Sequence, residues 1–398
     1  MRLKGEQILA MAKDIEPEII NWRRTVHRYP ELGMETPRTS EFIEDTLKSM
    51  GIEVKKAAGY GVVGTLRDSG HRTIAVRADI DALPVTEETG LPYASEVPGR
   101  MHACGHDAHV AIVLGTAKIL SQLKGHLKGN VKFIFQPGEE GPGGAQPMID
   151  DGALEDPAVD AIIGGHVGML WPVESGRFGF KAGPIMAATD SFTITIKGKG
   201  GHGATPNQCI DPVVIAAQVV LSMQAIVSRE VNPISPAVIT IGKIEAGTRH
   251  NIIPQDCTMH GTVRYLDRAF ERFIPKRIEE MVTGVSRAMR GDAVLEYRYG
   301  YRPLVNDPEI TKLVKKAASS VAGSENVVDV AEPTMGGEDM SYYLEKVPGT
   351  FIAIGTGNKE KGTAYPNHHP KFTVDEDVLH VASGVFARAC LDFLDEKD

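Results

Sequence analysis

The residues with the clearest chemical potential lie in one stretch, Met101-His-Ala-Cys-Gly-His-Asp-Ala-His109. It combines a thiol at Cys104, three imidazoles and a carboxylate within nine residues. Thiolate, imidazole and carboxylate together are the ligands that a borderline divalent metal such as zinc selects. Cys104 and His106 are two residues apart, so in an extended loop both face the same way and can share one ion. The stretch therefore predicts metal-dependent chemistry.

Two adjacent carboxylates, Glu139 and Glu140, follow an apolar segment and precede a glycine-rich loop that ends at Gly144. Adjacent side chains on an extended turn diverge. One glutamate can therefore hold a metal ion while the other takes a proton from the attacking water and passes it to a leaving amine. Two glutamates in a turn are usually plain solvated charge, but the glycines here let the backbone approach a ligand closely. The pair predicts one metal ligand and one general base.

Single histidines add further candidates. His166 follows the apolar segment at 161–163, and His368 and His369 stand directly before Pro370. A structural zinc site is an alternative, but such sites usually close with paired spacings such as C-x₂₋₄-C. The candidates here are of mixed type and lie in several segments, which favours an open catalytic site. His102 and His109 are interpreted as neighbours that pack against the ligands or support them.

Three aspartates are expected to orient these ligands. Asp79 and Asp81 end a buried apolar segment, and period-2 spacing on an extended chain points both side chains the same way. The alternative is that they only cap the next element. Asp107, beside His106, has the character of a supporting or bridging carboxylate.

Apolar periodicity predicts the elements that position these residues. Helices are expected at 5–28, 37–50 and 108–123, and strands at 53–57, 62–66, 73–78, 131–136 and 161–163. His27, at the end of the first helix, is expected to pack or cap rather than to bind metal. Each candidate ligand follows an apolar strand or begins a helix, as in α/β proteins that gather distant residues on one rim of the sheet. The fold class is therefore α/β, with a mixed, mostly parallel twisted sheet flanked by helices.

The pattern changes near residue 184, where strands begin to alternate between apolar and polar residues. The order strand–helix–strand–strand–helix–strand predicts a ferredoxin-like α+β domain at 184–299, inserted into a catalytic domain formed by 1–183 and 300–398. His202, in a glycine-rich stretch, is expected to contact substrate. Asn251 and Arg264 could bind a substrate carboxylate, or be a turn asparagine and a surface arginine.

Composition limits the possible partners. The net charge is −9 and the basic residues do not cluster, which argues against nucleic acid and anionic membranes. No apolar run approaches the roughly 18 residues of a spanning helix. Four widely spaced cysteines suit a reducing, cytoplasmic setting. Gly59-Tyr-Gly-Val-Val-Gly64 fits the dinucleotide fingerprint, but a strand rather than a helix is expected after it, which excludes that function.

The combined motifs resemble the amidohydrolase branch of the metal-dependent aminoacylase/carboxypeptidase family, which includes hippurate hydrolases, auxin–amino acid conjugate hydrolases and N-acetyl-diaminopimelate deacetylases. The likeness runs from His27 to Pro370. The motifs are His102-Ala-Cys-Gly-His-Asp-Ala-His109, Gln136-Pro-x-Glu139-Glu140, Gly165-His166, Gly198-Lys-Gly-Gly-His202, Asn251-Ile-Ile-Pro254, Met335-Gly-Gly-Glu338-Asp339 and Asn367-His368-x-Pro370.

The resemblance implies two divalent metal ions per subunit, Glu139 as general base and acid, His202 near the scissile carbonyl and Asn251 at the substrate. Zinc suits the thiolate, and manganese, cobalt or nickel can occupy the same ligands. The inserted domain would be a lid and dimerisation surface in a homodimer or homotetramer. The implied metal ligands are Cys104, His106, Glu140, His166 and His368.

Two positions depart from the family pattern. The wider family has His-x-Asp where this chain has Arg77-Ala-Asp79, and His369 follows His368 where a small residue is commoner. The first metal site is therefore expected to differ from that of the wider family, with Cys104 compensating, and His368 is preferred to His369 as the ligand.

The predicted activity is hydrolysis of the amide bond of N-acyl-L-amino acids. The acyl group, the preferred amino acid, the metal and the oligomeric state stay open. A metallo-carboxypeptidase or dipeptidase is the alternative among enzymes. The non-enzyme alternative is a catalytically silent metal-binding protein, which would have no need of a free second glutamate.

Overall fold

The computed structural model describes residues 3–395. The chain divides into two compact units. Unit 1 contains the segment up to Ile185, the segment Val305–Thr334 and the segment from Asp339 onward. Unit 2 contains Met186–Leu304 and the short segment Met335–Glu338.

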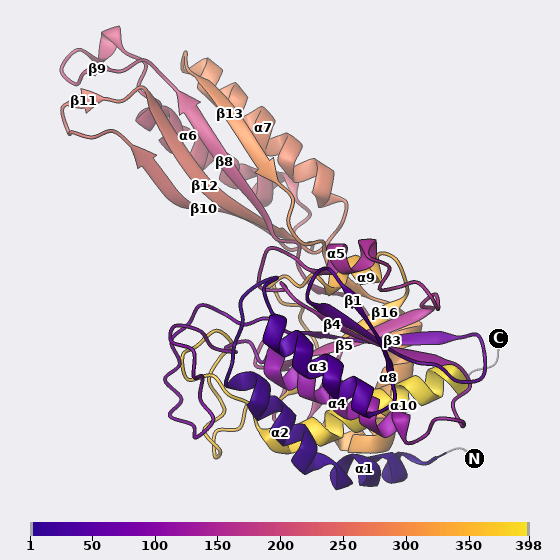
Figure 1. The fold of residues 1–398 in the computed structure, drawn as a ribbon. Coiled ribbons are helices and arrows are strands. Elements are labelled where there is room, and N and C mark those ends of the chain that lie inside the picture. Colours follow the sequence, from indigo (N-terminus) through magenta and orange to yellow (C-terminus); the bar gives the residue numbers. More distant parts are fainter. Residues whose placement is uncertain (1–2, 396–398) are drawn as a thin grey trace. The chain divides into compact units, whose positions relative to one another are not determined.

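Unit 1 is built on an eight-stranded mixed sheet with the strand order β1-β2-β4-β3-β5-β16-β6-β15 (Figure 1). The four neighbouring strands β4, β3, β5 and β16 are parallel to one another, and all their residues are buried. Continuous apolar runs are typical of parallel strands that are covered on both faces. The strands are β1 (Glu53–Ala57), β2 (Gly61–Leu66), β3 (Thr73–Asp79), β4 (Asn130–Gln136), β5 (Ala161–Gly168), β6 (Phe178–Phe180), β15 (Val327–Asp329) and β16 (Gly349–Gly355).

Helices cover this sheet. The helices α3, α4, α8 and α10 pack on one face in a single apolar core, with α1 and α2 outside them, and the short helices α5 and α9 lie on the other face (Figure 1). The helices are α1 (Gly5–Asp14), α2 (Glu16–His27), α3 (Pro37–Ser49), α4 (His106–Ser121), α5 (Ala145–Asp150), α8 (Pro308–Ala322), α9 (Met340–Leu344) and α10 (Leu379–Asp395).

Unit 2 is a four-stranded antiparallel sheet with the order β10-β12-β8-β13. The helices α6 and α7 pack against it in a separate apolar core. This order and the alternation of strands and helices are those of a ferredoxin-like fold. The elements are β8 (Asp190–Lys197), β9 (Gly201–His202), α6 (Pro212–Ala225), β10 (Ala237–Ala246), β11 (Ile252–Ile253), β12 (Asp256–Tyr265), α7 (Phe270–Ala288) and β13 (Asp292–Arg298); in addition, β7 (Gly183–Met186) pairs with β14 (Leu304–Asn306).

The predicted fold class is confirmed, with local corrections. The helix expected at 5–28 is two helices that break at Ile15, because Pro17 near the start of α2 lacks the N–H that a continuous helix needs. The strand expected at 161–163 continues to Gly168, so His166 lies inside β5 rather than after it. The segment 61–66 is a strand. The reason for rejecting the dinucleotide fingerprint, a strand where a helix would be needed, is therefore confirmed.

Candidate active site

Six candidate site residues meet in unit 1, although they come from four separate parts of the chain. Two lie around the start of α4, two in the loop after β4, one in β5 and one in the loop before Pro370. Ligand atoms within 4.8 Å of one another form overlapping groups, one with His106 and His166 around Cys104, another with Glu140 and His368 around the same thiol. We call the six residues the ligand cluster: Cys104, His106, Glu139, Glu140, His166 and His368.

Main-chain carbonyls fix the orientation of two imidazoles in this cluster. His106 Nδ1 lies 2.8 Å from Asp81 O, and His166 Nδ1 lies 2.7 Å from Val167 O. A carbonyl only accepts, so each Nδ1 carries a proton and each Nε2 is the nitrogen left to bind a metal ion in the cluster. Among the described residues, the buried His106 Nε2 has no hydrogen-bond partner. This is the arrangement of a histidine prepared to bind a metal ion.

The distances between ligand atoms fit a shared cation. Cys104 Sγ is 3.4 Å from His166 Nε2, and Glu140 Oε1 is 3.3 Å from His368 Nε2. Atoms bound tetrahedrally to one zinc ion at its usual bond lengths are separated by about 3.3–3.8 Å. Thiolate, imidazole and carboxylate donors at these separations are suited to one or more borderline divalent metals.

Electrostatics also favour a bound cation. Burial raises the pKa of the Cys104 thiol well above its usual value, and the carboxylates of Glu140 and Glu139 raise it further. Burial lowers the pKa of His106, but the nearby carboxylates of Asp79 and Asp81 outweigh it and raise the pKa to about 10. Without a cation, therefore, a proton occupies His106 and the thiol stays neutral. A divalent ion would supply the missing positive charge and favour the thiolate.

Asp79 supports the cluster through His109. Asp79 Oδ1 lies 2.5 Å from His109 Nδ1, and His109 Nε2 accepts the Val167 N–H at 2.9 Å. Both ring nitrogens of His109 thus have hydrogen-bond partners, and its ligand atoms form a further group with those of Asp79 and His106 within 4.8 Å. Arg77 stands where the wider family has a histidine, and it donates to Asp79 at 2.8 Å. Asp79, rather than Arg77, faces the cluster, with its carboxylate 3.7 Å from His106 Nε2.

Asp81 holds three members of the cluster at once. Its carboxylate accepts the backbone N–H groups of Glu139 at 3.0 Å and Glu140 at 3.1 Å, and its own carbonyl orients His106. Because Asp81 is fully buried, each of these hydrogen bonds is costly to lose. Asp81 therefore contacts three members of the cluster directly, and Asp79 contacts the cluster through His109.

Asp107 lies apart from the cluster and belongs to none of the ligand groups found in residues 3–395. Its carboxylate accepts from Arg23 Nε at 3.0 Å and from His27 Nδ1 at 2.8 Å, which holds the pKa of Asp107 well below its usual range despite burial. The expected bridging position is therefore not observed. His27 bonds Asp107 and Glu87, a packing role at the end of α2.

Asn367 belongs to one of the quoted motifs but was given no role from the sequence, and in the structure it bonds the segments that carry Cys104 and His166. Its amide donates to Cys104 O at 3.2 Å and Val167 O at 3.3 Å, and its carbonyl accepts the Met169 N–H at 2.9 Å. The next residue, His368, adopts a left-handed conformation with φ of 70°. A non-glycine residue in this conformation stores backbone strain that the surrounding contacts have to hold. The only signal in the sequence was the position of Asn367 directly before a candidate ligand.

His369 faces a different environment from His368. Its ring stacks on Tyr365, with centroids 4.8 Å apart, and its Nδ1 accepts the Lys371 N–H at 3.0 Å. Of the two adjacent histidines, His368 is therefore the one that reaches the ligand cluster.

The remaining candidates lie in unit 2. His202 and Asn251 are neighbours, because β9 pairs with β11 and the Gly203 N–H donates to Asn251 O at 2.9 Å. Arg264 stands eight residues beyond Asp256 along β12, about 26 Å from the start of that strand at ~3.3 Å per residue. Asn251 and Arg264 of one chain therefore do not meet around a single carboxylate.

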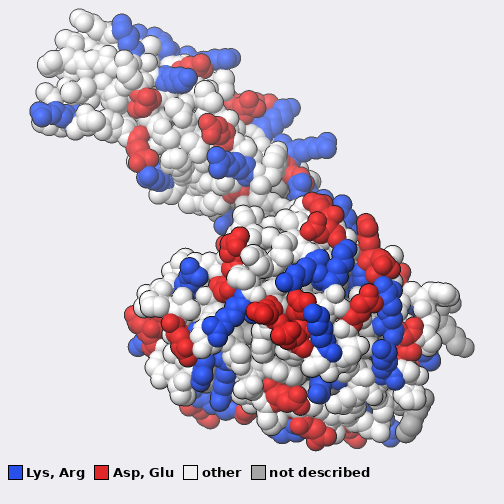
Figure 2. Space-filling model, viewed as in Figure 1, with Lys and Arg blue, Asp and Glu red and all other residues white. Residues whose placement is uncertain are grey.

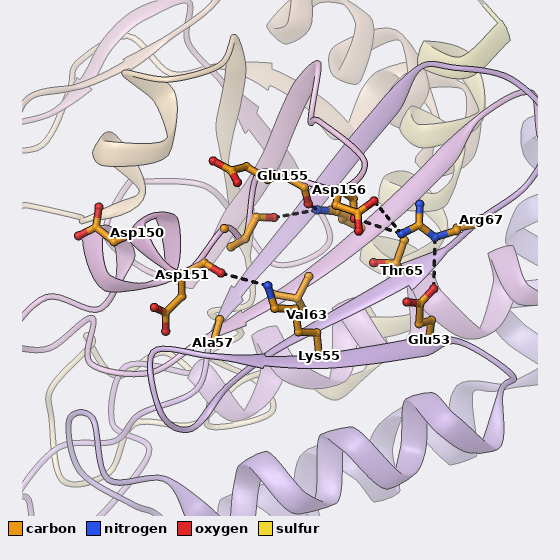
Figure 3. Close-up of a pocket in the computed structure, with 13 residues that line it drawn as sticks. Glu53, Lys55, Ala57, Val63, Thr65, Arg67, Asp150, Asp151, Glu155 and Asp156 are labelled. Carbon is orange, nitrogen blue, oxygen red and sulfur yellow. Dashed lines mark hydrogen bonds and ion pairs between the residues drawn. The ribbon is translucent and has the colours of Figure 1, made fainter.

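A second charged region of unit 1 is a cavity of about 310 Å³ (Figure 3). We call it the Lys132 cavity. Its floor is the face of β1, β2 and β4 that carries Lys55, Thr65 and Lys132, and the segment 150–156 closes one side. None of the ligand-cluster residues lines it.

Unit 1 presents buried thiol, imidazole and carboxylate groups in one cluster, and unit 2 is a ferredoxin-like insertion. This combination is typical of metal-dependent hydrolases that act on amide bonds. The sequence profile of "Peptidase family M20/M25/M40" matches residues 75–392, and the chain belongs to this family. The resemblance inferred from the motifs is thus confirmed.

Individual relatives differ in their activity. The chain is 43% identical over 394 residues to thermostable carboxypeptidase 1 of Saccharolobus solfataricus, covering 97% of both chains. It is 43% identical over 308 residues to an N-acyl-L-amino acid amidohydrolase of Geobacillus stearothermophilus, covering 76% of this chain and 82% of that one. The crystal structure of Bacillus subtilis YXEP, described as a dinuclear metal binding peptidase, matches with a TM-score of 0.84 and 36% identity, covering 97% of this chain and 99% of that chain.

Proposed function

We propose that this protein hydrolyses the amide bond of N-acyl-L-amino acids, using two divalent metal ions and Glu139 as general base and acid. The observation that carries the proposal is the convergence of buried ligand atoms around Cys104 with a second, adjacent glutamate in the same cluster. A protein that only stored metal would need Glu140 but not Glu139.

The two overlapping ligand groups support the assignment of two ions, held by Cys104, His106, Glu140, His166 and His368. Zinc suits the thiolate best, and manganese, cobalt or nickel fit the same donors. When bound, the cations polarise the amide carbonyl and make the attacking water more acidic.

Glu139 takes up the proton of the attacking water and delivers it to the leaving amine. Its backbone is fixed by Asp81, which also fixes Glu140, so the base and the metal ligand keep a constant separation. This preorganisation removes the need to order the two groups during the reaction.

His202 is the proposed donor to the tetrahedral oxyanion. Its Nδ1 accepts the Ala204 N–H at 3.0 Å, so the neutral ring carries its proton on Nε2, where it can donate. Asn251, beside His202, would bind the substrate carboxylate. Arg264 is the alternative residue for binding that carboxylate, in a bidentate fashion. Whether His202 acts on its own subunit or across a dimer stays open.

The outer surface of α6 supports a homodimer, with a tetramer as the larger alternative, formed through unit 2. One side of α6 packs into the core through residues such as Val219 and Met223, while Val213, Val214 and Leu221 are exposed. A helix that is apolar on two sides is typical of one with a second partner. Unit 2 would then serve as lid and dimerisation surface.

The helix Pro212–Glu230 is also long and apolar enough to cross a membrane by length and composition, which for one helix is weak evidence. Lys, Arg, Asp and Glu are mixed over the lower part of the face shown in Figure 2, and no nucleic acid or membrane partner is part of the proposal. All four cysteines are free and buried, which suits the proposed cytoplasmic location.

The test is amine release from N-acetyl and N-benzoyl amino acids, N-blocked peptides and free dipeptides, each with and without chelator. We expect chelator-sensitive hydrolysis of the acylated amino acids. Cleavage confined to peptides would instead establish the carboxypeptidase or dipeptidase alternative, which the 43% identity to a carboxypeptidase makes the second candidate. If a protein that retains zinc, manganese or cobalt hydrolyses none of these substrates, the metal-binding alternative is favoured.

A further inference from the structure

Asp339 is a buried carboxylate that the proposed mechanism does not use. It has no solvent exposure and accepts hydrogen bonds from two side chains and two backbone N–H groups. The donors are Arg77 at 2.8 Å, Gln136 at 2.9 and 2.7 Å, Gly144 at 2.9 Å and Ala145 at 3.0 Å.

Two of these donors lie at one end of the Glu139–Glu140 loop and one at the other. Gln136 is the last residue of β4, and Gly144 and Ala145 begin α5, so the loop between them is pinned at both ends by one carboxylate. A side chain at Gly144 would meet Pro137 O at 1.7 Å, which shows how closely the two ends approach. Asp81 holds the middle of the same loop.

Pro137 and Pro142 restrict the backbone of this loop, but the three glycines between Gln136 and Gly144 leave it freedom that the hydrogen bonds to Asp339 and Asp81 limit. Gly138, Gly141 and Gly143 adopt positive φ angles of 76°, 116° and 98°. Glycine has the largest backbone freedom of any residue, so contacts from outside the loop add to the order that the internal Gly143 N–H to Gly138 O hydrogen bond of 2.8 Å provides.

Arg77 connects the clamp to the other side of the cluster. Its guanidinium bridges Asp339 and Asp79, each at 2.8 Å, and Asp79 holds His109, which in turn accepts the Val167 N–H beside His166. A continuous buried network therefore joins the loop of the base to the strand of a candidate ligand.

We propose that Asp339 is a positioning residue that sets the location of Glu139 and Glu140 by holding both ends of their loop. The role of Glu139 in this inference rests on the proposed function, but the role of Glu140 can be tested by metal binding alone. Misplacement of a catalytic group by about 1 Å can lower the rate about 100-fold.

The test compares Asp339→Asn with Asp375→Asn, a buried carboxylate that also accepts several hydrogen bonds, from Ser175, Asn358 and Lys361. At saturating metal, Asp339→Asn is expected to lower kcat about 100-fold with KM within about threefold. Its metal affinity, measured by chelator competition with cobalt, should fall about tenfold. Asp375→Asn should lower Tm while leaving kcat and metal affinity within about twofold.

A charge swap separates loop positioning from simple neutralisation of Arg77. The double variant Gln136→Glu, Asp339→Ala places a carboxylate beside Arg77 and removes the acceptor for the Gly144 and Ala145 N–H groups. We expect it to recover less than a tenth of the lost kcat. Full recovery, or wild-type kcat and metal affinity in Asp339→Asn, would overturn the proposal.

If Asp339→Asn does not fold, Asp339→Glu keeps the charge and displaces the loop, with the same expected losses. If the wild type has no amidase activity, the proposed function is contradicted. A tenfold loss of cobalt affinity in Asp339→Asn would still support the positioning role in that case.

Discussion

Two charged regions of unit 1 differ in how their polar atoms are satisfied. In the Lys132 cavity the cations have partners: Lys132 donates to Ala153 O and Glu155 O, and Arg67 pairs with Glu53 at 3.2 Å and Asp156 at 3.3 Å. In the ligand cluster, lone pairs of thiol, imidazole and carboxylate converge instead, and across the described part of the chain His106 Nε2 finds no hydrogen-bond donor or acceptor.

The difference between the Lys132 cavity and the ligand cluster indicates which feature is typical of a metal site. The Lys132 cavity has room and many charges, but opposite charges neutralise one another there (Figure 3). The cluster gathers electron-pair donors of one kind, which is unfavourable in a buried setting unless a cation joins them. Buried ligand atoms that converge on one place, with His106 Nε2 lacking a hydrogen-bond partner among residues 3–395, therefore distinguish the candidate active site better than cavity size or the number of charges does.

The largest expected effect comes from changing Glu139 to Gln. Removing a general base typically costs 10²–10⁴ in rate, so we expect kcat to fall about 1,000-fold with the metal content unchanged. Steady-state kinetics and metal analysis of the purified variant measure both quantities. Glu155→Gln, in the Lys132 cavity, is the matched control and should keep kcat within about twofold.

The metal content decides how a loss of activity in Glu139→Gln is interpreted. If this variant loses metal while Glu140→Gln retains it, the roles of the two adjacent glutamates are exchanged.

The next effect is on stability through the metal. A ligand present at about 1,000 times its Kd stabilises the folded state by about 4 kcal/mol, so a chelator should lower Tm by on the order of 10 °C. In Cys104→Ser a hydroxyl replaces the soft thiolate, and the Tm shift caused by chelator should fall to half or less. Thermal melts with and without chelator provide the measurement. An unchanged shift in this variant, matching that of a Cys209→Ser control, would remove Cys104 from the metal site.

The sequence predicted the parts of this comparison that depend on residue type and periodicity. Buried parallel strands are continuous apolar runs, so β3 and β4 were recognisable, and the ligands stood out because Cys, His and Glu rarely gather without a reason. The four-stranded unit was recognisable because its strands alternate in polarity and are separated by two amphipathic segments.

Partners that are distant in sequence were not predictable. Asp339 bonds Gly144 across 195 residues and Asn367 bonds Cys104 across 263, and no local pattern encodes either contact. Asp107 shows the converse error. It stands beside His106, but successive residues on a helix diverge by about 100°, so its carboxylate faces Arg23 instead of the cluster.

A smaller effect is expected from Lys132, and it depends on pH. Burial lowers the pKa of Lys132 to about 8 from 10.5, although Asp156 opposes the shift. Between these two pKa values the unfolded chain binds more protons than the folded chain, so the free energy of unfolding rises with pH. The cost of burying the charged lysine is fully present below about pH 8 and disappears as the pH rises towards 10.5.

Lys132→Met removes this titration. Relative to that variant, the free energy of unfolding of the wild type should increase by on the order of 2 kcal/mol between pH 8 and 10.5. Urea unfolding at intervals of pH tests the slope, and parallel curves for the two proteins would show that Lys132 titrates normally. The metal content should be the same in both, because Lys132 is outside the ligand cluster.

The smallest effect should come from Arg67→Gln. The arginine side chain is 43% exposed and its partners Glu53 and Asp156 are 67% and 93% exposed, so solvent screens both ion pairs. Exposed pairs of this kind contribute about 0–1 kcal/mol, and we expect a stability change below about 0.5 kcal/mol with kcat within about twofold. Urea unfolding and the same kinetic assay measure the two values. A tenfold loss of activity here would mean that the Lys132 cavity contributes to function, and the distinction between satisfied and uncompensated charges would no longer separate the two regions.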